Sequence, residues 1–313
     1  MSRKSKQEAK SLKIIALSLA FVAALNTTWA QTGEHNDNVP TAGSSAIGFV
    51  YNPVSGIRAN SMFQAGDFIG NAIAAQAASP FQMFILGEPM ISLRYKYKLS
   101  PTTAFRASVG FSGANFNYKE YVLDDILYKV DALTTEQVED VIHFKMLGGG
   151  INVGLEFSGG TGNLRFNGGF GVAYNFGGGS TQFTYGNKMT QDNPMPGVIS
   201  LIDSLRMSGT YYDINLAAAR PTNRYNIGMH HAFGITFDLG LEWFFAKNLS
   251  VGGSVNFTPL IYAIQPETYS EMEAYSMTDR RVLNFTRKIS SGSNYLLYGT
   301  ENIGVLVSFN YYF

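Results

Sequence analysis

The last eleven residues of the chain alternate between two kinds of side chain. One set is apolar and ends in aromatic residues: Ile303, Val305, Val307, Phe309, Tyr311 and Phe313. The other set is smaller or more polar: Gly304, Leu306, Ser308, Asn310 and Tyr312. Because successive side chains of a strand point to opposite faces, this pattern predicts a strand with one apolar face. Such a face suits a strand that meets lipid on one side and a barrel lumen on the other.

The same period of two returns in six further segments, which makes seven legible strands. They cover 91–99, 105–112, 147–157, 164–176, 226–245 and 249–257. An eighth strand near 46–51 is needed to bring both ends of the chain to the same side. A hairpin inside 263–300 would raise the count to ten. Residues 67–78 fit a short helix as well as a strand.

The connections between these strands alternate between short and long. The short ones are 100–102, 158–162 and 246–248, and the long ones are about 52–80, 118–142, 186–224 and 263–300. Outer-membrane barrels have short periplasmic turns and longer extracellular loops. We therefore expect the short turns in the periplasm and the long loops outside.

A soluble β-sandwich is the structural alternative, since its strands alternate too. The outward positions near strand ends, however, are rich in aromatic residues such as Tyr95, Tyr174 and Trp243. Aromatic belts at the two membrane interfaces explain this placement directly. We predict an all-β fold over 31–313, a closed antiparallel transmembrane β-barrel of eight strands.

The N-terminus carries a basic leader followed by the apolar run 14–25. This run is shorter than the about 20 residues that a membrane-spanning helix needs. Thr28-Trp29-Ala30 offers a cleavage site with small residues, so we predict a signal peptide over 1–30 that is cleaved after Ala30. Residues 31–43 would then form a periplasmic segment before the barrel. The chain has no cysteine, which excludes disulfides, lipoprotein acylation and thiolate metal sites.

The charge balance changes when the leader is removed. The full chain has 23 basic and 23 acidic residues, and the leader holds five of the former and only Glu8 of the latter, so the mature net charge is 18 minus 22, or −4. No basic excess indicates nucleic-acid binding. The remaining apolar residues are spread through short segments, which argues against a helical membrane protein.

The hairpin over 90–107 reads Met-Ile-Ser-Leu-Arg-Tyr-Lys-Tyr-Lys-Leu-Ser-Pro-Thr-Thr-Ala-Phe-Arg-Ala. With the terminal aromatic strand it resembles the small outer-membrane β-barrel proteins of the porin-family, opacity-like group, which share the outer membrane protein A type of barrel. The resemblance implies the outer membrane of a Gram-negative cell, with lipid and lipopolysaccharide around the barrel. It also implies a signal for the barrel assembly machinery on Phe309, Tyr311 and Phe313. Its members include adhesins, envelope anchors, small-solute channels and lipid enzymes.

Charged residues fall on the face that would line the lumen. They are Arg94, Lys96, Lys98, Arg106, Glu156, Arg165, Asp238 and Glu242. We expect Glu156 and Arg165 to lie opposite each other across their hairpin turn. Eight strands leave room only for side chains, so paired charges that fill the lumen are one interpretation. A narrow path lined by Arg94, Lys96, Lys98 and Arg106 is the other.

Many of the inward positions are glycine, for example Gly154, Gly169 and Gly171. Small inward residues permit strong strand coiling, and they could alternatively empty a pocket. Coiling is the interpretation we favour, because the charged side chains must occupy the lumen.

We predict no catalytic residues, cofactor or metal. Outer-membrane lipid hydrolases resemble one another in a His-x-Ser pair on one strand face, and none of His35, His143, His230 and His231 is part of one. Adjacent His230 and His231 point to opposite faces of a strand and cannot bind one metal together.

The long loops are the remaining place for function, because binding residues concentrate on loops held by a rigid scaffold. Loop 118–142 has seven acids, loop 186–224 holds an apolar cluster around 198–205, and loop 263–300 combines tyrosines with arginines. Asp203-Ser204-Leu205 also matches a short O-glycosylation pattern. The preferred function is a structural or surface-interaction role; a channel or carrier for small solutes comes second, and a lipid enzyme third.

Overall fold

The computed structural model describes residues 39–52, 91–198, 217–299 and 303–313. The predicted signal peptide 1–30, most of segment 31–43, almost all of loop 52–80 with segment 67–78, and the Asp203-Ser204-Leu205 pattern lie outside these ranges. The described residues form one antiparallel sheet and the short helix α5 (Asp125–Val130). The strands are β1 (Ser45–Tyr51), β2 (Ile91–Lys98), β3 (Thr103–Leu123), β4 (Gln137–Gly159), β5 (Leu164–Thr184), β6 (Ala217–Ala246), β7 (Leu249–Gln265), β8 (Thr268–Ser276), β9 (Arg281–Ser290), β10 (Ser293–Tyr298) and β11 (Ile303–Tyr312).

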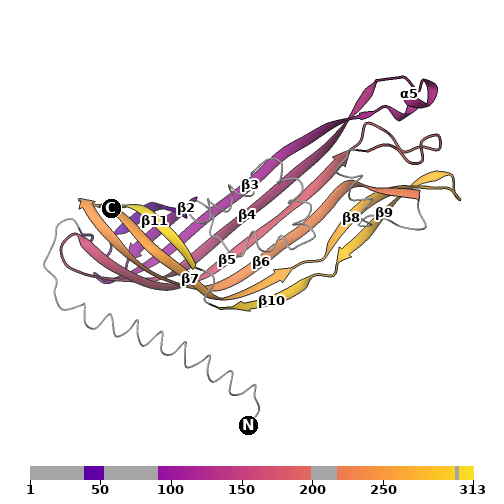
Figure 1. The fold of residues 1–313 in the computed structure, drawn as a ribbon. Helices are drawn as coiled ribbons and strands as arrows, with labels where there is room; N and C mark the ends of the chain where they lie inside the picture. Colours follow the sequence, from indigo (N-terminus) through magenta and orange to yellow (C-terminus); the bar gives the residue numbers. More distant parts are fainter. Residues whose placement is uncertain (1–38, 53–90, 199–216, 300–302) are drawn as a thin grey trace, which may run out of the picture.

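Eight of these strands pair in a ring, which confirms the predicted fold class (Figure 1). The order is β1-β2-β3-β4-β5-β6-β7-β11, and β11 pairs again with β1. The backbone of Phe313 donates to Ser45 at 2.8 Å and accepts from it at 2.9 Å, so the last residue joins the first strand. A closed ring leaves no open strand edge around its circumference.

The three remaining strands lengthen the wall and do not widen the ring. Along β6, β7 ends opposite His231 and β8 resumes opposite Asn226, so the two form one interrupted strand. The interruption holds Pro266, which has no backbone N–H to donate to a ladder. In the same way β9 pairs with β8, and β10 and β11 both pair with β7. The expected loop 263–300 is therefore largely strand, and its hairpin leaves the ring at eight strands.

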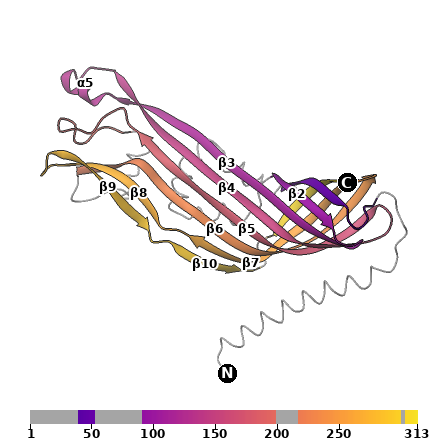
Figure 2. The same cartoon turned by 180° about the vertical axis from the view of Figure 1, so that it is seen from behind.

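Loops 118–142 and 186–224 are also shorter than predicted. The β3–β4 ladder continues to Leu123 opposite Gln137, and β6 already begins at Ala217. Figures 1 and 2 show the result: β3, β4, β5, β6, β8 and β9 run far past the ring and carry α5 at the distal end. In this extension the strands no longer have one apolar face. Alternation of apolar and polar residues therefore cannot distinguish strand from loop there.

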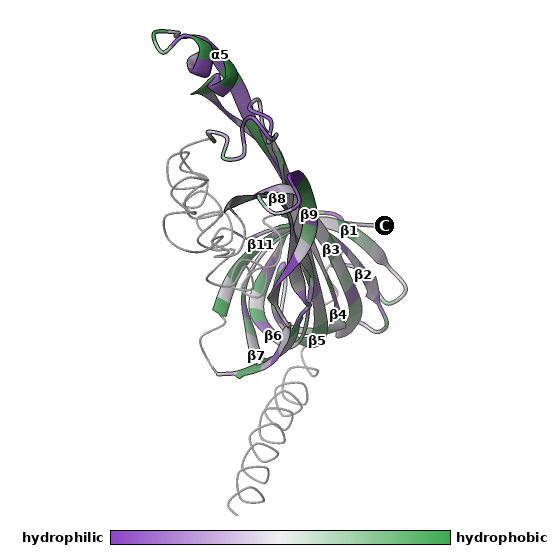
Figure 3. Cartoon of the chain, turned by 90° about the vertical axis from the view of Figure 1, so that its right-hand side faces the viewer, coloured by the Kyte–Doolittle hydropathy of each residue, from purple (hydrophilic) through white to green (hydrophobic). Residues whose placement is uncertain are grey.

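The two faces of the ring differ in polarity. Outward side chains are large, apolar and exposed, for example Phe49 at 60% and Leu239 at 59% exposure, whereas inward Lys96 and Glu242 are 2% and 3% exposed. Green apolar segments recur along the ring strands in Figure 3. An apolar exterior that surrounds a polar interior inverts the arrangement of a water-soluble protein and requires a lipid environment.

Candidate functional site

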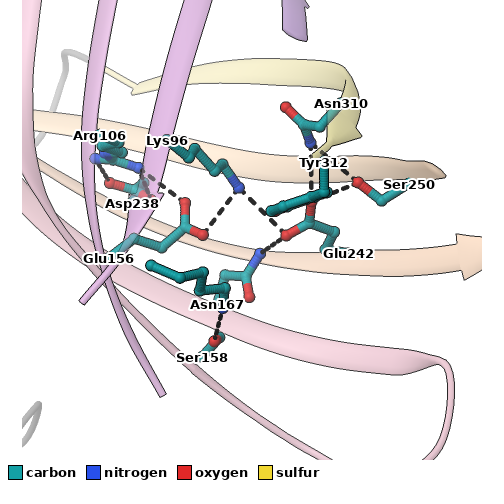
Figure 4. Close-up of polar contacts among 11 residues, drawn as sticks. Lys96, Arg106, Glu156, Ser158, Asn167, Asp238, Glu242, Ser250, Asn310 and Tyr312 are labelled. Atoms are coloured by element: carbon teal, nitrogen blue, oxygen red, sulfur yellow. Dashed lines mark hydrogen bonds and ion pairs between the residues drawn. The ribbon is translucent and has the colours of Figure 1, made fainter. Parts of the chain in front are cut away.

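The lumen of the ring is crossed by buried ion pairs (Figure 4). Lys96 on β2 places its Nζ 2.9 Å from Glu156 Oε1 on β4 and 3.2 Å from Glu242 Oε2 on β6. The strands β2 and β6 lie four positions apart whichever way the ring is followed. The Lys96–Glu242 pair therefore joins opposite walls of the barrel.

Glu242 is the most heavily hydrogen-bonded side chain in this set. Its two carboxylate oxygens accept from five groups: Lys96 Nζ at 3.2 Å, Asn167 Nδ2 at 3.2 Å, Ser250 Oγ at 2.5 Å, Asn310 Nδ2 at 2.8 Å and the Tyr312 hydroxyl at 2.9 Å. A buried carboxylate is tolerated when a cation and additional donors satisfy its lone pairs. The uncharged donors come from inward positions of β5, β7 and β11 that the sequence reasoning did not assign to the site.

A second group of contacts lies beside Glu242. The guanidinium of Arg106 on β3 donates to both carboxylate oxygens of Asp238 on β6, and it lies 3.8 Å from Glu156 Oε2. Lys98 donates to Ser158 at 2.9 Å. We call Lys96, Lys98, Arg106, Glu156, Asp238 and Glu242, together with the donors to Glu242, the lumen network.

The structure does not bring the two remaining predicted lumen residues into this network in the same way. Arg94 is buried on the inward face, and no described residue accepts a hydrogen bond from its Nε. The expected pairing of Glu156 with Arg165 is wrong, because Glu156 lies opposite Gly169 while Arg165 lies opposite Glu242 in the ladders. Arg165 donates instead to the carbonyl oxygen of Gly160 in its own turn.

Glycines on the inward face make room for the network. A Cβ on Gly169 would lie 3.0 Å from Asp238 Oδ1 and 2.8 Å from the Leu155 carbonyl oxygen. Gly154 and Gly171 face each other across β4 and β5, and a Cβ on either would come closer than 3.0 Å to the opposite backbone. Gly154 and Gly171 therefore permit a close approach of β4 and β5, and Gly169 leaves space for the Asp238 carboxylate; strand coiling, the favoured interpretation, stays a prediction.

The short-turn end of the barrel is filled by apolar groups. Phe244 and Tyr312 pack with Ala46, and Val39 from the described part of segment 31–43 packs against them. The aromatic residues Phe309, Tyr311 and Phe313 lie exposed on the outer face of β11 and its end. This apolar cluster therefore borders the lumen network, and Tyr312 takes part in both.

The histidines lie as the strand geometry predicts, on opposite faces. His230 is buried, whereas His231 is part of the outer face, where its Nδ1 lies 2.8 Å from the Tyr174 hydroxyl. His143 contacts Asn117 in the outer extension. Within the described ranges, no three His, Asp or Glu side chains are grouped as metal ligands. No helix in these ranges is long and apolar enough to cross a bilayer.

Charged pairs in the outer extension differ in exposure. Arg220 on β6 donates to Glu273 on β8 at 2.6 Å, and the Arg220 side chain is only 3% exposed, whereas the pair of Lys119 and Glu139 is open to solvent. Lys119 donates to Glu139 at 2.8 Å across the β3–β4 ladder. This hydrogen bond, together with the negative charge of Glu139, raises the pKa of the Lys119 amine above its ordinary value. An exposed pair of this kind is screened by solvent and contributes little to stability, unlike the buried pairs of the lumen.

A closed ring of eight antiparallel strands with an apolar exterior and a polar interior has the architecture of a small outer-membrane β-barrel. No protein-family model matches the chain, and no curated protein matches it. Among solved structures it is similar to the outer membrane protein OprG from Pseudomonas aeruginosa, with 11% identity, a TM-score of 0.31, and coverage of 89% of this chain and 99% of that one. It is also similar to Ail, the attachment invasion locus protein of Yersinia pestis, with 9% identity, a TM-score of 0.29, and coverage of 87% and 99%. A major outer membrane protein from Thermus thermophilus gives 11% identity, a TM-score of 0.28, and coverage of 87% and 98%. With scores this low, none of these likenesses supports a statement about what the chain does.

Proposed function

We propose that this chain is an outer-membrane protein whose barrel anchors a surface-interaction platform, formed by the extension of β3, β4, β5, β6, β8 and β9. The observation that carries the proposal is the Lys96–Glu242 pair across the lumen. A barrel whose interior is occupied by paired charges serves as an anchor, and the residues free to meet a partner are those of the extension.

The alternative is a channel or carrier for small solutes, lined by Arg94, Lys96, Lys98 and Arg106. Two of these cations are engaged by carboxylates in the structure, Lys96 by Glu156 and Glu242, and Arg106 by Asp238. Ions could pass only if these pairs separated, which breaks buried interactions. A lipid enzyme ranks third, because none of the four histidines is part of a His-x-Ser pair.

Conductance of the refolded protein in planar lipid bilayers tests the anchor against the channel. We expect no discrete opening events from the wild-type chain. Steady, ion-selective openings that change in Arg106→Ala would overturn the anchor function in favour of the channel. Openings that appear only in Glu242→Ala would show that the lumen network seals a barrel that can otherwise conduct.

Orientation and export form part of the same proposal. The chain has no native cysteine, so a single introduced cysteine is the one site that a maleimide can label. A membrane-impermeant maleimide should label Val130→Cys in α5 on intact cells, and Lys247→Cys in the β6–β7 turn only after permeabilisation. The opposite labelling pattern would contradict the assignment of the extension to the outside. The mature protein should begin at Gln31 by mass spectrometry, after cleavage behind Ala30.

The proposal includes lipopolysaccharide around the apolar exterior and assembly through the terminal strand. Phe309, Tyr311 and Phe313 are exposed on the outer face, which suits recognition by the assembly machinery. Removal of Phe313 should reduce the amount of folded barrel in the outer membrane. The control is Tyr121→Ser, which removes an exposed aromatic side chain from the extension and should leave this amount unchanged. An equal amount of both would argue against the terminal signal.

A further inference from the structure

The distal end of the extension exposes a set of apolar side chains. None of the residues of α5 is buried, and Val130 is 83% exposed. Leu133 in the following turn is 89% exposed, and Met195 in the segment after β5 is 62% exposed. Ile126, Leu127 and Tyr128 are exposed as well. We call these six residues the distal patch.

Hydrogen bonds connect the two segments that carry the distal patch. The carboxylate of Asp125 accepts from the backbone N–H of Gly197 at 2.7 Å and from Asn193 Nδ2 at 2.8 Å. Asn187 accepts from the backbone N–H of Asp125 at 3.0 Å and donates to the Leu123 carbonyl oxygen at 2.7 Å. Asn187 and Asn193 are buried. These contacts fix the β3–β4 hairpin to the segment after β5.

The start of α5 is fixed in the same way. Asp124 caps the helix, and its Oδ1 accepts from the backbone N–H groups of Ile126 at 2.9 Å and Leu127 at 3.1 Å. A side-chain cap of this kind satisfies donors that the helix itself leaves open. The apolar residues are thus presented by ordered backbone, so a partner would lose little of its binding energy to ordering them.

The surroundings of the distal patch are acidic. Asp124, Asp131, Glu136 and Asp192 lie in the same two segments. The same two segments hold two lysines. Lys188 is exposed in the segment after β5, and the ammonium of Lys129 is used within the tip, where it donates to Asn193 Oδ1 at 3.0 Å and to the Asp192 carbonyl oxygen. With Asp125 counted, residues 124–136 and 185–198 hold five acids against these two lysines. A partner therefore meets exposed apolar side chains inside a negative rim.

We propose that the distal patch is the docking surface for a cationic, amphipathic segment of another protein. Apolar side chains of such a segment would cover Val130 and Leu133, and its lysines or arginines would meet the carboxylates of the rim. The same rim repels anionic lipid headgroups, sulfated glycans and a second copy of the patch. This inference rests on the proposed surface-interaction function and names the surface and the chemistry of its partner.

A synthetic amphipathic peptide tests the inference, made in cationic, neutral and anionic versions with the same apolar residues. Binding is measured to the full chain in lipid nanodiscs. We expect the cationic version to bind at least about tenfold more tightly than the anionic one, with a preference that weakens as salt is added. Equal binding of all three versions, or no binding of any, would overturn the inference.

Two variants locate the binding site. Leu133→Ser should weaken binding of the cationic peptide at least about tenfold, since a small polar side chain replaces an apolar anchor without changing the charge. The matched control is Met277→Ser, because Met277 is 61% exposed in the turn between β8 and β9 and is not one of the six residues of the patch. An equal loss in both variants would overturn the assignment to α5. Conductance does not involve the patch, and labelling of Val130→Cys reports on which side of the membrane α5 lies whether or not the patch binds a partner, so failure here is distinguishable from failure of the proposed function.

Discussion

Lys96 on β2 and Glu242 on β6 form an ion pair across the full width of the barrel, although 146 residues separate them in the chain. Each is buried, and each has further partners on other strands. The pair therefore connects opposite walls of the barrel. The two side chains can meet because the ring closes and brings β2 and β6 to face each other across the lumen.

Replacing Glu242 with alanine should destabilise the barrel strongly. The change leaves the Lys96 ammonium with one carboxylate fewer and removes the acceptor of four uncharged donors. Loss of one partner of a buried pair costs about 3–5 kcal/mol. Urea unfolding of the protein refolded in lipid measures the effect. Glu139→Ala is the control and should change the unfolding free energy far less than Glu242→Ala, because its pair with Lys119 is exposed to solvent.

Arg106 and Asp238 should behave as a coupled pair. Arg106→Leu removes the cation that faces the Asp238 carboxylate, and Asp238→Leu leaves Arg106 with Glu156 as its acidic neighbour, whereas the double variant removes both members of the pair. We expect the double variant to be more stable than the sum of the single effects by about 1–3 kcal/mol. Urea unfolding of the wild type, the two single variants and the double variant completes this double-mutant cycle. Simple additivity would mean that the two side chains do not interact in the folded barrel.

Gly169→Ala should disturb the network without removing any of its groups. The new methyl would come within 3.0 Å of Asp238 Oδ1 and press against the Leu155 carbonyl oxygen. Overpacking of this kind costs about 1–3 kcal/mol. Gly253→Ala is the matched control, since a Cβ there meets no atom within 4 Å. A variant at 169 as stable as the one at 253 would contradict the assigned role of the glycine.

Arg165→Ala should have a small effect, unlike Lys96→Ala. Arg165 donates to the carbonyl oxygen of Gly160, and no ion pair links it to a described acidic residue. Loss of one such hydrogen bond costs about 1 kcal/mol. Lys96→Ala removes a cation from two buried carboxylates and should cost at least twice as much. Similar losses of unfolding free energy in the two variants would mean that Arg165 belongs to the lumen network.

The ring itself could be predicted from the sequence because lipid outside and polar groups inside impose the same alternation on every strand. Segments such as 91–99 and 303–313 show it without interruption. The extension could not be predicted in this way. From Ser112 on β3 the ladder continues between faces that no longer differ in polarity, so the residues taken for loop 118–142 include paired strand. Backbone pairing persists there without a hydrophobic signature.

Placement of charges in the lumen was predictable, but their partners were not. The prediction for Glu156 and Arg165 assumed a register for their hairpin, and the β4–β5 ladder places Gly169 opposite Glu156 instead. The actual partners of Glu156, Lys96 on β2 and Arg106 on β3, are set by side chains that reach across the curved interior. That geometry depends on ring size and tilt, which alternation does not specify.

Glu242 also links the two ends of the described sheet. Two of its donors, Asn310 and Tyr312, belong to β11, the most C-terminal of the described strands, and a third, Lys96, belongs to β2, which follows β1 at the other end. A sheet that lacks either end leaves this carboxylate with too few donors in a dry interior. Each incomplete ring is therefore penalised, and the seam between β11 and β1 is favoured over closure in a shifted register.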